Sequence, residues 1–181
     1  KAFITFLTAG DPNEKLSLKM LKALPDAGVD VIELGMPFSD PMADGPTIQK
    51  SYIRSLKSGN TLEKTLQLVK NFRKSNNLTP IILMGYFNPI LQMGLNKFCN
   101  LAKQSGVDGV LIVDMPPEAN NEFNEIFNSK VLNIIRLVTP TTDSKRVLDI
   151  LNTSSGFLYY VSIKGITGSK INLGSEIKKN Y

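Results

Sequence analysis

The sequence contains no histidine, no tryptophan and a single cysteine, Cys99, in 181 residues. One thiol excludes a disulfide within the chain, and with it the class of small secreted proteins that such bonds staple together. Without histidine, a zinc site built from Cys and His is not expected either, and we predict no metal site. Any general acid or base that works near neutral pH must then be a carboxylate, tyrosine, lysine or cysteine with a shifted pKa.

Long hydrophobic runs are also missing. No stretch approaches the roughly 18 apolar residues that a membrane-spanning helix needs, and no signal-peptide pattern opens the chain. The composition, 42% hydrophobic and 20% charged, suits one folded α/β or α+β domain. The net charge of +5 comes from lysines that are scattered over several helical stretches. We therefore expect neither a membrane segment nor nucleic-acid binding.

Short apolar runs alternate with longer helical patterns along the chain. The runs span residues 3–9, 29–34, 80–84, 109–113, 132–138 and 157–161. The helical stretches fall near residues 13–27, 47–57, 61–75, 95–105, 118–127, 144–152 and 173–179. Runs such as VLIV and PIILM do not alternate polar and apolar residues, so both faces of these strands should be buried. That pattern is typical of a parallel sheet covered by helices.

A repeating strand–helix pattern leaves two main architectures, an open doubly wound sheet or a closed eight-stranded barrel. Six units in 181 residues average about 30 residues each, so eight would need about 240, near the roughly 250 of a (β/α)8 TIM barrel. A doubly wound sheet usually carries G-x-G-x-x-G after its first strand, but Gly10-Asp11-Pro12 follows here. The sequence predicts an α/β fold, a partial TIM-barrel domain over residues 1–181 that covers about strands 1–6.

Glu33 is the first catalytic candidate, because it lies between Ile32 and Leu34 inside a run that should be buried. An ionised carboxylate is costly there unless it is paired or its pKa rises. A raised pKa would make Glu33 a proton donor near neutral pH. The alternative is a glutamate at a strand end that pairs with a distant cation or caps a neighbouring loop.

The loop over residues 35–49, GMPFSDPMADGPTIQ, contains three prolines and two glycines. A stiff loop at the rim of a site can hold a second carboxylate at a fixed distance from the strand. Asp40 suits an ordinary Asx-turn. Asp44 could serve in the site or, equally, cap a helix that Pro46 opens.

Two further features lie near the end of the chain. Tyr159 and Tyr160 are adjacent in one apolar run, so they should point to opposite faces of the sheet, and packing alone could explain both. The loop over residues 162–174, SIKGITGSKINLG, has three glycines. Such a loop could be a lid that closes over substrate, or merely an exposed loop.

Several motifs together carry a resemblance to a known family. FITFLTAGDP, DVIELGMPFSDPMADGPTIQ, PIILMGYFNPI, GVDGVLIVDMPPEA and FLYYVSIKGITG follow one another along the chain. In this order they closely resemble the tryptophan synthase alpha chain family, and the second motif is long and very specific. The resemblance covers essentially the whole chain and implies a (β/α)8 barrel.

The resemblance implies a cytoplasmic carbon–carbon lyase of tryptophan biosynthesis. Such a lyase cleaves indole-3-glycerol phosphate to indole and glyceraldehyde 3-phosphate by retro-aldol chemistry. The family implies a beta chain as partner in an α2β2 tetramer, with pyridoxal phosphate on the beta chain and no cofactor in this one. It also implies a helix before Lys1, and strands seven and eight with the phosphate site beyond Tyr181. We therefore expect the 181 residues alone to be inactive.

The family's site residues carry over motif by motif. Glu33 of the ELG strand is implied as the acid/base, Asp44 of the ADGP segment as the group that contacts the indole nitrogen, and Tyr159 as a third catalytic residue. Thr167 and Gly168 belong to the G-I-T-G lid, where Thr167 is expected to hold Asp44 on closure. The apolar side chains expected to line the indole pocket are Phe6, Met84 and Leu111.

Other functions stay open at this point. One alternative is a stand-alone indole-releasing lyase of the same family, and another is a catalytically dead subunit kept as an allosteric partner. A third is a different phosphate-binding barrel, such as a sugar-phosphate isomerase. The GMPFSDPMADGPTIQ loop disfavours the isomerase, and the presence of both carboxylates disfavours the dead subunit.

Overall fold

The computed structural model describes residues 1–161, apart from residue 120 and residues 130–131. In this part of the chain six strands form one parallel sheet in the order of the sequence. The strands are β1 (Ile4–Thr8), β2 (Val31–Gly35), β3 (Ile81–Gly85), β4 (Gly109–Ile112), β5 (Asn133–Val138) and β6 (Leu158–Tyr160). The α-helices are α1 (Glu14–Ala23), α2 (Pro46–Lys57), α3 (Leu62–Arg73), α4 (Phe87–Met93), α5 (Leu95–Ser105), α6 (Asn121–Ser129) and α7 (Ser144–Asn152), with a short 3-10 turn at Pro117–Ala119.

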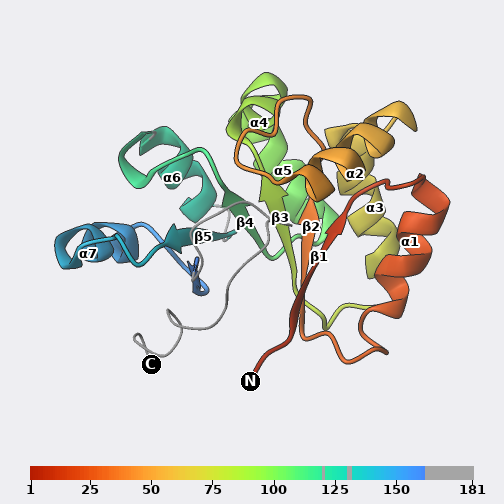
Figure 1. Cartoon of the computed structure of the whole chain (residues 1–181), viewed down its shortest axis with the longest axis horizontal. Coiled ribbons are helices and arrows are strands. Elements are labelled where there is room, and N and C mark those ends of the chain that lie inside the picture. Colours follow the sequence, from red (N-terminus) through yellow and green to blue (C-terminus); the bar gives the residue numbers. More distant parts are fainter. Residues whose placement is uncertain (120, 130–131, 162–181) are drawn as a thin grey trace.

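The sheet curves, and the helices lie along its outer side in nearly the same order as the strands (Figure 1). Parallel neighbours need a crossover connection, and each connection between consecutive strands contains at least one helix. This arrangement is the strand–helix part of a TIM barrel, as the sequence predicted. None of the helices described within residues 1–161 is both long and apolar enough to cross a membrane.

The two faces of the sheet pack differently. Ile32, Leu34 and Leu83 point outward into the large core beneath the helices, where they are fully buried. A smaller apolar cluster forms on the inner face around Ile82 and Leu111. Strands β2 to β5 each therefore contribute apolar side chains to both faces, which explains the uninterrupted hydrophobic runs of the sequence.

Several helix boundaries differ from the sequence prediction. The first helix is capped by Asn13 but ends at Ala23 instead of residue 27, because Pro25 has no N–H to continue the helical ladder. The sequence analysis missed α4, which contains Pro89 near its start. A proline in the first turn removes an amide that has no partner inside the helix anyway, so Pro89 does not prevent the helix. The helix predicted near residues 173–179 lies outside the described residues.

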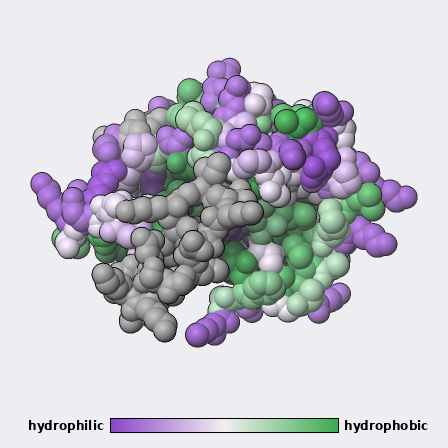
Figure 2. Space-filling view, viewed as in Figure 1, coloured by the Kyte–Doolittle hydropathy of each residue, from purple (hydrophilic) through white to green (hydrophobic). Residues whose placement is uncertain are grey.

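The lower part of the sheet carries exposed apolar surface. Figure 2 shows hydrophobic residues gathered around the lower parts of β1 and β2. Phe3 and Ile4 belong to the exposed apolar side chains of this first strand region, at 54% and 37% exposure. The chemistry-bearing residues lie toward the opposite, carboxyl ends of the strands, where TIM-barrel enzymes place their active sites.

Candidate active site

Glu33 lies on the inner face of the sheet. Strand register places it beside Phe6 of β1 and Ile82 of β3, and its side chain is only 4% exposed. Its Oε1 atom is buried and finds no hydrogen-bond partner among the described residues. Burial raises the pKa of Glu33 from 4.5 to about 7. The group can therefore hold a proton at neutral pH and release it at little cost.

Asp44 lies in the loop between β2 and α2, and it does not cap the helix. Gly45 occupies the capping position and Pro46 opens α2, so the capping alternative for Asp44 is wrong. Its carboxylate is 7% exposed and accepts a hydrogen bond of 2.7 Å from the hydroxyl of Tyr86. Burial raises the pKa of Asp44, and the bond from Tyr86 opposes that rise.

Tyr86 is a site residue that the sequence analysis did not single out. It follows β3 directly, is 1% exposed, and accepts a hydrogen bond of 2.9 Å from the backbone N–H of Ala43. Its ring also packs against Phe38, with the ring centres 5.4 Å apart. Tyr86 thus forms hydrogen bonds to two adjacent residues of the loop, Ala43 and Asp44. The available signal was its position at the carboxyl end of a strand, where functional groups gather.

Tyr159 points to the inner face, and Tyr160 to the other, as strand alternation predicted. Tyr159 pairs in register with Leu137 and packs with the inner apolar cluster, whereas Tyr160 is 45% exposed. Burial raises the pKa of the Tyr159 hydroxyl, and the negative charge of ionised Glu33 raises it further. Tyr159 and Glu33 are therefore electrostatic neighbours across the sheet.

The predicted apolar lining also lies on the inner face. Met84 and Leu111 are register partners and belong to the same apolar cluster as Tyr159. Phe6 packs directly over Gly35, where an added Cβ would come within 2.5 Å of the ring. A side chain at that point would force the Phe6 ring to shift, because the ring occupies the space that the Cβ would need. The other two predicted residues, Thr167 and Gly168, lie outside the described residues.

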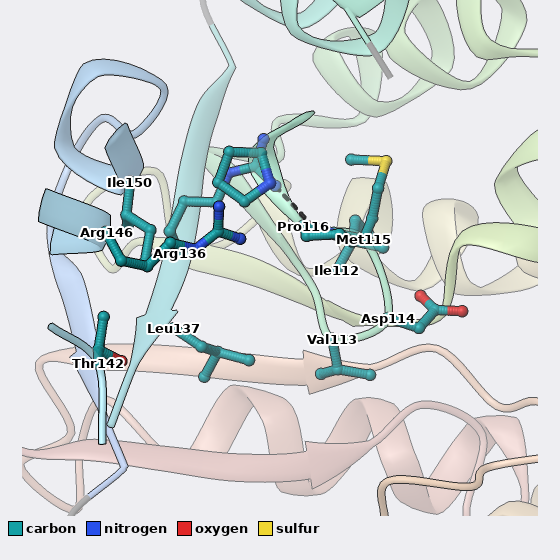
Figure 3. A pocket seen from close by; sticks show the side chains of 11 residues that line it. Ile112, Val113, Asp114, Met115, Pro116, Arg136, Leu137, Thr142, Arg146 and Ile150 are labelled. Carbon is teal, nitrogen blue, oxygen red and sulfur yellow. Dashed lines mark hydrogen bonds between the residues drawn. The ribbon is translucent and has the colours of Figure 1, made fainter. Parts of the chain in front are cut away.

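A separate cavity of about 360 Å³ lies beside the ends of β4 and β5, next to α7 (Figure 3). Arg136 and Arg146 line it, but Glu33, Asp44 and Tyr159 do not. Arg146 is paired with Glu118 at 2.8 Å, and Arg136 donates to the carbonyl of Met115. Both cations are thus engaged in contacts within the protein.

The inner face has the chemical character of an acid–base site for an apolar substrate. Glu33 is a buried acid next to aromatic and aliphatic side chains, and Asp44 is a buried carboxylate with one strong donor. In the part of the chain that the structure describes, no three His, Cys, Asp or Glu side chains lie close enough together to hold a metal ion. The groups that are present can move a proton and stabilise a positive charge.

Known proteins share this sequence and this fold. The family model described as tryptophan synthase alpha chain matches residues 1–180. The tryptophan synthase alpha chain from Legionella pneumophila superimposes with a TM-score of 0.86 at 40% identity, over 90% of this chain and 61% of that one. The tryptophan synthase complex from Pyrococcus furiosus contains a chain that matches with a TM-score of 0.83 at 45% identity, over 88% of this chain and 65% of its own length.

Another Pyrococcus furiosus structure, described as the tryptophan synthase α2β2 complex, also matches at 45% identity and a TM-score of 0.83, over 88% of this chain and 67% of that one. The chain spans less than two thirds of the Legionella protein, at 61% of its length. The match of the family model over residues 1–180 nevertheless runs through all six strands. The chain belongs to the tryptophan synthase alpha chain family.

Proposed function

We propose that this chain carries the acid–base residues of a lyase that cleaves indole-3-glycerol phosphate to indole and glyceraldehyde 3-phosphate. The observation that carries the proposal is the state of Glu33, which is 4% exposed and has an Oε1 atom without a described partner. A carboxyl with a pKa of about 7 is suited to give and take back one proton at neutral pH.

The first step is protonation of the indole ring. Neutral Glu33 donates its proton to carbon 3, and the ring nitrogen becomes part of a cationic system that can accept electrons. The Asp44 carboxylate accepts the N–H hydrogen bond of that cation and stabilises its charge. The bond from Tyr86 goes to Oδ2, so among the described residues Oδ1 stays available for this contact.

The second step breaks the carbon–carbon bond. Its electron pair returns to the ring and neutralises the nitrogen, while the adjacent glycerol hydroxyl becomes an aldehyde. The hydroxyl proton passes to Glu33, which the first step left ionised, so the acid is regenerated. In this proposal Tyr159, the electrostatic neighbour of Glu33, bonds the reacting hydroxyl.

The proposal extends to partners and cofactor. We infer that a beta chain binds the intact subunit in an α2β2 assembly in the cytoplasm, because a similar chain stands in a Pyrococcus complex so described. The chemistry above needs no cofactor, and pyridoxal phosphate belongs to the beta chain in this proposal. Co-purification with a beta chain, and faster indole release on mixing, would favour this assembly over a stand-alone lyase.

An indole-release assay on the intact subunit tests the function. Glu33→Gln and Asp44→Asn should each lower the rate by roughly 10²–10⁴-fold, and Tyr159→Phe should lower it less. Asp40→Asn is the matched control, because the Asp40 side chain is exposed in the same loop and, among the described residues, accepts a hydrogen bond only from its neighbour Ser39. Near-normal rates for both Glu33→Gln and Asp44→Asn would refute the assigned roles, and no indole from the wild type would refute the reaction.

A further inference from the structure

A chain of hydrogen bonds links the loops that follow three consecutive strands. Asp44 follows β2, Tyr86 follows β3, and Asp114 follows β4. Tyr86 donates to Asp44, and the backbone N–H of Phe87, the next residue, donates to Oδ1 of Asp114 at 2.8 Å. Each loop is thus tied to the next at the residue that carries, or adjoins, a functional side chain.

Tyr86 depends on this outside support because of its place in the chain. It is the N-cap residue of α4, and its side chain makes no capping bond, because a tyrosine hydroxyl lies too far from its own backbone to reach the first turn; the hydroxyl is directed to Asp44 instead. A helix start normally gains an acceptor from its own cap residue. Here Asp114 from the neighbouring loop accepts a hydrogen bond from the N–H of Phe87, the first residue of α4, and so fixes the backbone immediately after Tyr86.

The two chain neighbours of Asp114 are themselves held by hydrogen bonds, one to β3 and one from β5. The N–H of Val113 donates to the carbonyl of Gly85 at 2.9 Å, and Nη1 of Arg136 donates to the carbonyl of Met115 at 2.8 Å. Arg136 is 5% exposed. Figure 3 shows the Asp114 carboxylate directed away from Arg136. Hydrogen bonds therefore hold the backbone on both sides of Asp114, while its side chain accepts from the first N–H of α4.

We propose that Asp114 is a positioning residue of the reaction: it fixes Tyr86, and through Tyr86 it holds Asp44 in place beneath the substrate. The inference rests on the proposed function and adds a residue to it. Asp114 touches neither substrate nor the reacting atoms. It acts through the bond that Tyr86 donates, which stays available because burial and nearby negative charge raise the pKa of Tyr86 well above its ordinary value.

The direction in which the pKa of Asp44 moves distinguishes a positioning role of Asp114 from an effect of its negative charge. Described groups that face Asp44 are Tyr86, which bonds to it, and Tyr52 of α2, which feels its charge. If loss of Asp114 lets Tyr86 move away, ionised Asp44 loses the hydrogen bond from the Tyr86 hydroxyl, so the pKa of Asp44 rises. If Asp114 acted only through its negative charge, removing it would lower the pKa of Asp44.

The experiment compares Asp114→Ala, Asp114→Asn, Tyr86→Phe and the double variant Tyr86→Phe/Asp114→Ala in the intact subunit. The kcat–pH profile is one readout, and NMR titration of the Asp44 carboxyl carbon is the other. Asp114→Ala should move the acid limb, where Asp44 ionises, upward by about half a pH unit and lower kcat several-fold. Tyr86→Phe should move it by about one unit. The alkaline limb, set by Glu33, should not move.

Two variants keep the proposal falsifiable. Asp114→Asn retains an oxygen that can accept from Phe87, so it should restore most of kcat, and the double variant should match Tyr86→Phe alone. The proposal would be overturned if the acid limb of Asp114→Ala moved downward or stayed in place, even if the melting temperature falls. It would also be overturned if the acid limb of the double variant moved by the sum of the two single shifts. The NMR titration measures the pKa of Asp44 without any turnover, so it tests the role of Asp114 even if the wild type releases no indole. Absence of indole would refute only the proposed function.

Discussion

Replacing Glu33 with glutamine should nearly abolish turnover and, at the same time, make the folded protein more stable above neutral pH. The side chain is 4% exposed, and its Oε1 atom lacks a partner among the described residues. Glutamine has nearly the shape of the protonated acid but never ionises, so the packing is kept and the charge is lost. Removal of a general acid–base group should slow indole release by roughly 10²–10⁴-fold.

The size of the stability gain follows from the pKa of Glu33, which burial raises from 4.5 to about 7. Well below pH 4.5 the carboxyl is protonated in both the folded and the unfolded protein, so its ionisation contributes nothing. As the pH rises past 7, the folded protein must ionise a group that has lost its water, which costs up to about 3 kcal/mol. The wild type therefore loses stability relative to the variant between these two pKa values.

Urea unfolding at about pH 4, 5.5 and 8 measures this difference. Glu33→Gln should exceed the wild type by close to zero, about 1.4 and about 3 kcal/mol at these three values. Glu125→Gln, on an exposed position of α6, is the matched control, because its side chain stays in water in both states. A difference that does not change with pH, or a variant less stable than the wild type at about pH 8, would show that Glu33 is not the buried acid described here.

Three further changes test other parts of the structure. Arg73→Ala should lower the free energy of unfolding by about 2–3 kcal/mol, because Arg73 donates to three backbone carbonyls and pairs with the partly exposed Asp108 at 2.6 Å; an unchanged urea midpoint would contradict this. Gly35→Ala should cost about 1–3 kcal/mol and weaken substrate binding, since the new methyl meets the Phe6 ring; unaltered KM and stability would argue against that contact. Tyr159→Phe should lower kcat with little change in melting temperature, and an unchanged kcat would remove Tyr159 from the site.

The fold could be predicted because its main signals are local. Uninterrupted apolar runs mark strands that are buried on both faces, and the spacing of the units gives the barrel architecture. The helix starts expected near residues 61 and 144 lie close to the observed ones, where Thr61 and Asp143 cap α3 and α7 with their side chains, a role that suits their residue types. The helix α4 was missed because it begins directly after β3 and contains a proline, two features that usually signal a loop.

The site was only partly readable, because its contacts join distant parts of the chain. Glu33 stands out in the sequence as a charge inside an apolar run. Asp44 remained ambiguous, since its donor Tyr86 is 42 residues away and no local pattern joins the two. The role of Arg136 was also unreadable from the sequence. It lies in the apolar run of β5, but its side chain points outward and donates to the carbonyl of Met115 in the loop after β4. Such contacts exist only once parallel strands bring their ends together.

The proposed mechanism needs opposite charge states on the two carboxylates, and their neighbours must supply the difference, because burial acts on both in the same direction. Burial alone raises the pKa of Glu33 and the pKa of Asp44, and would tend to leave two neutral acids. Among the described residues only Asp44 receives a donor, from Tyr86, and that bond favours its ionised form. Glu33 has apolar register neighbours instead, which favour its protonated form. Since these neighbours come from β1 and β3, and Tyr86 from the position directly after β3, the β2–α2 segment that carries both carboxylates cannot set their states by itself. A variant that loosens the loop after β3 should therefore impair catalysis without touching either carboxylate.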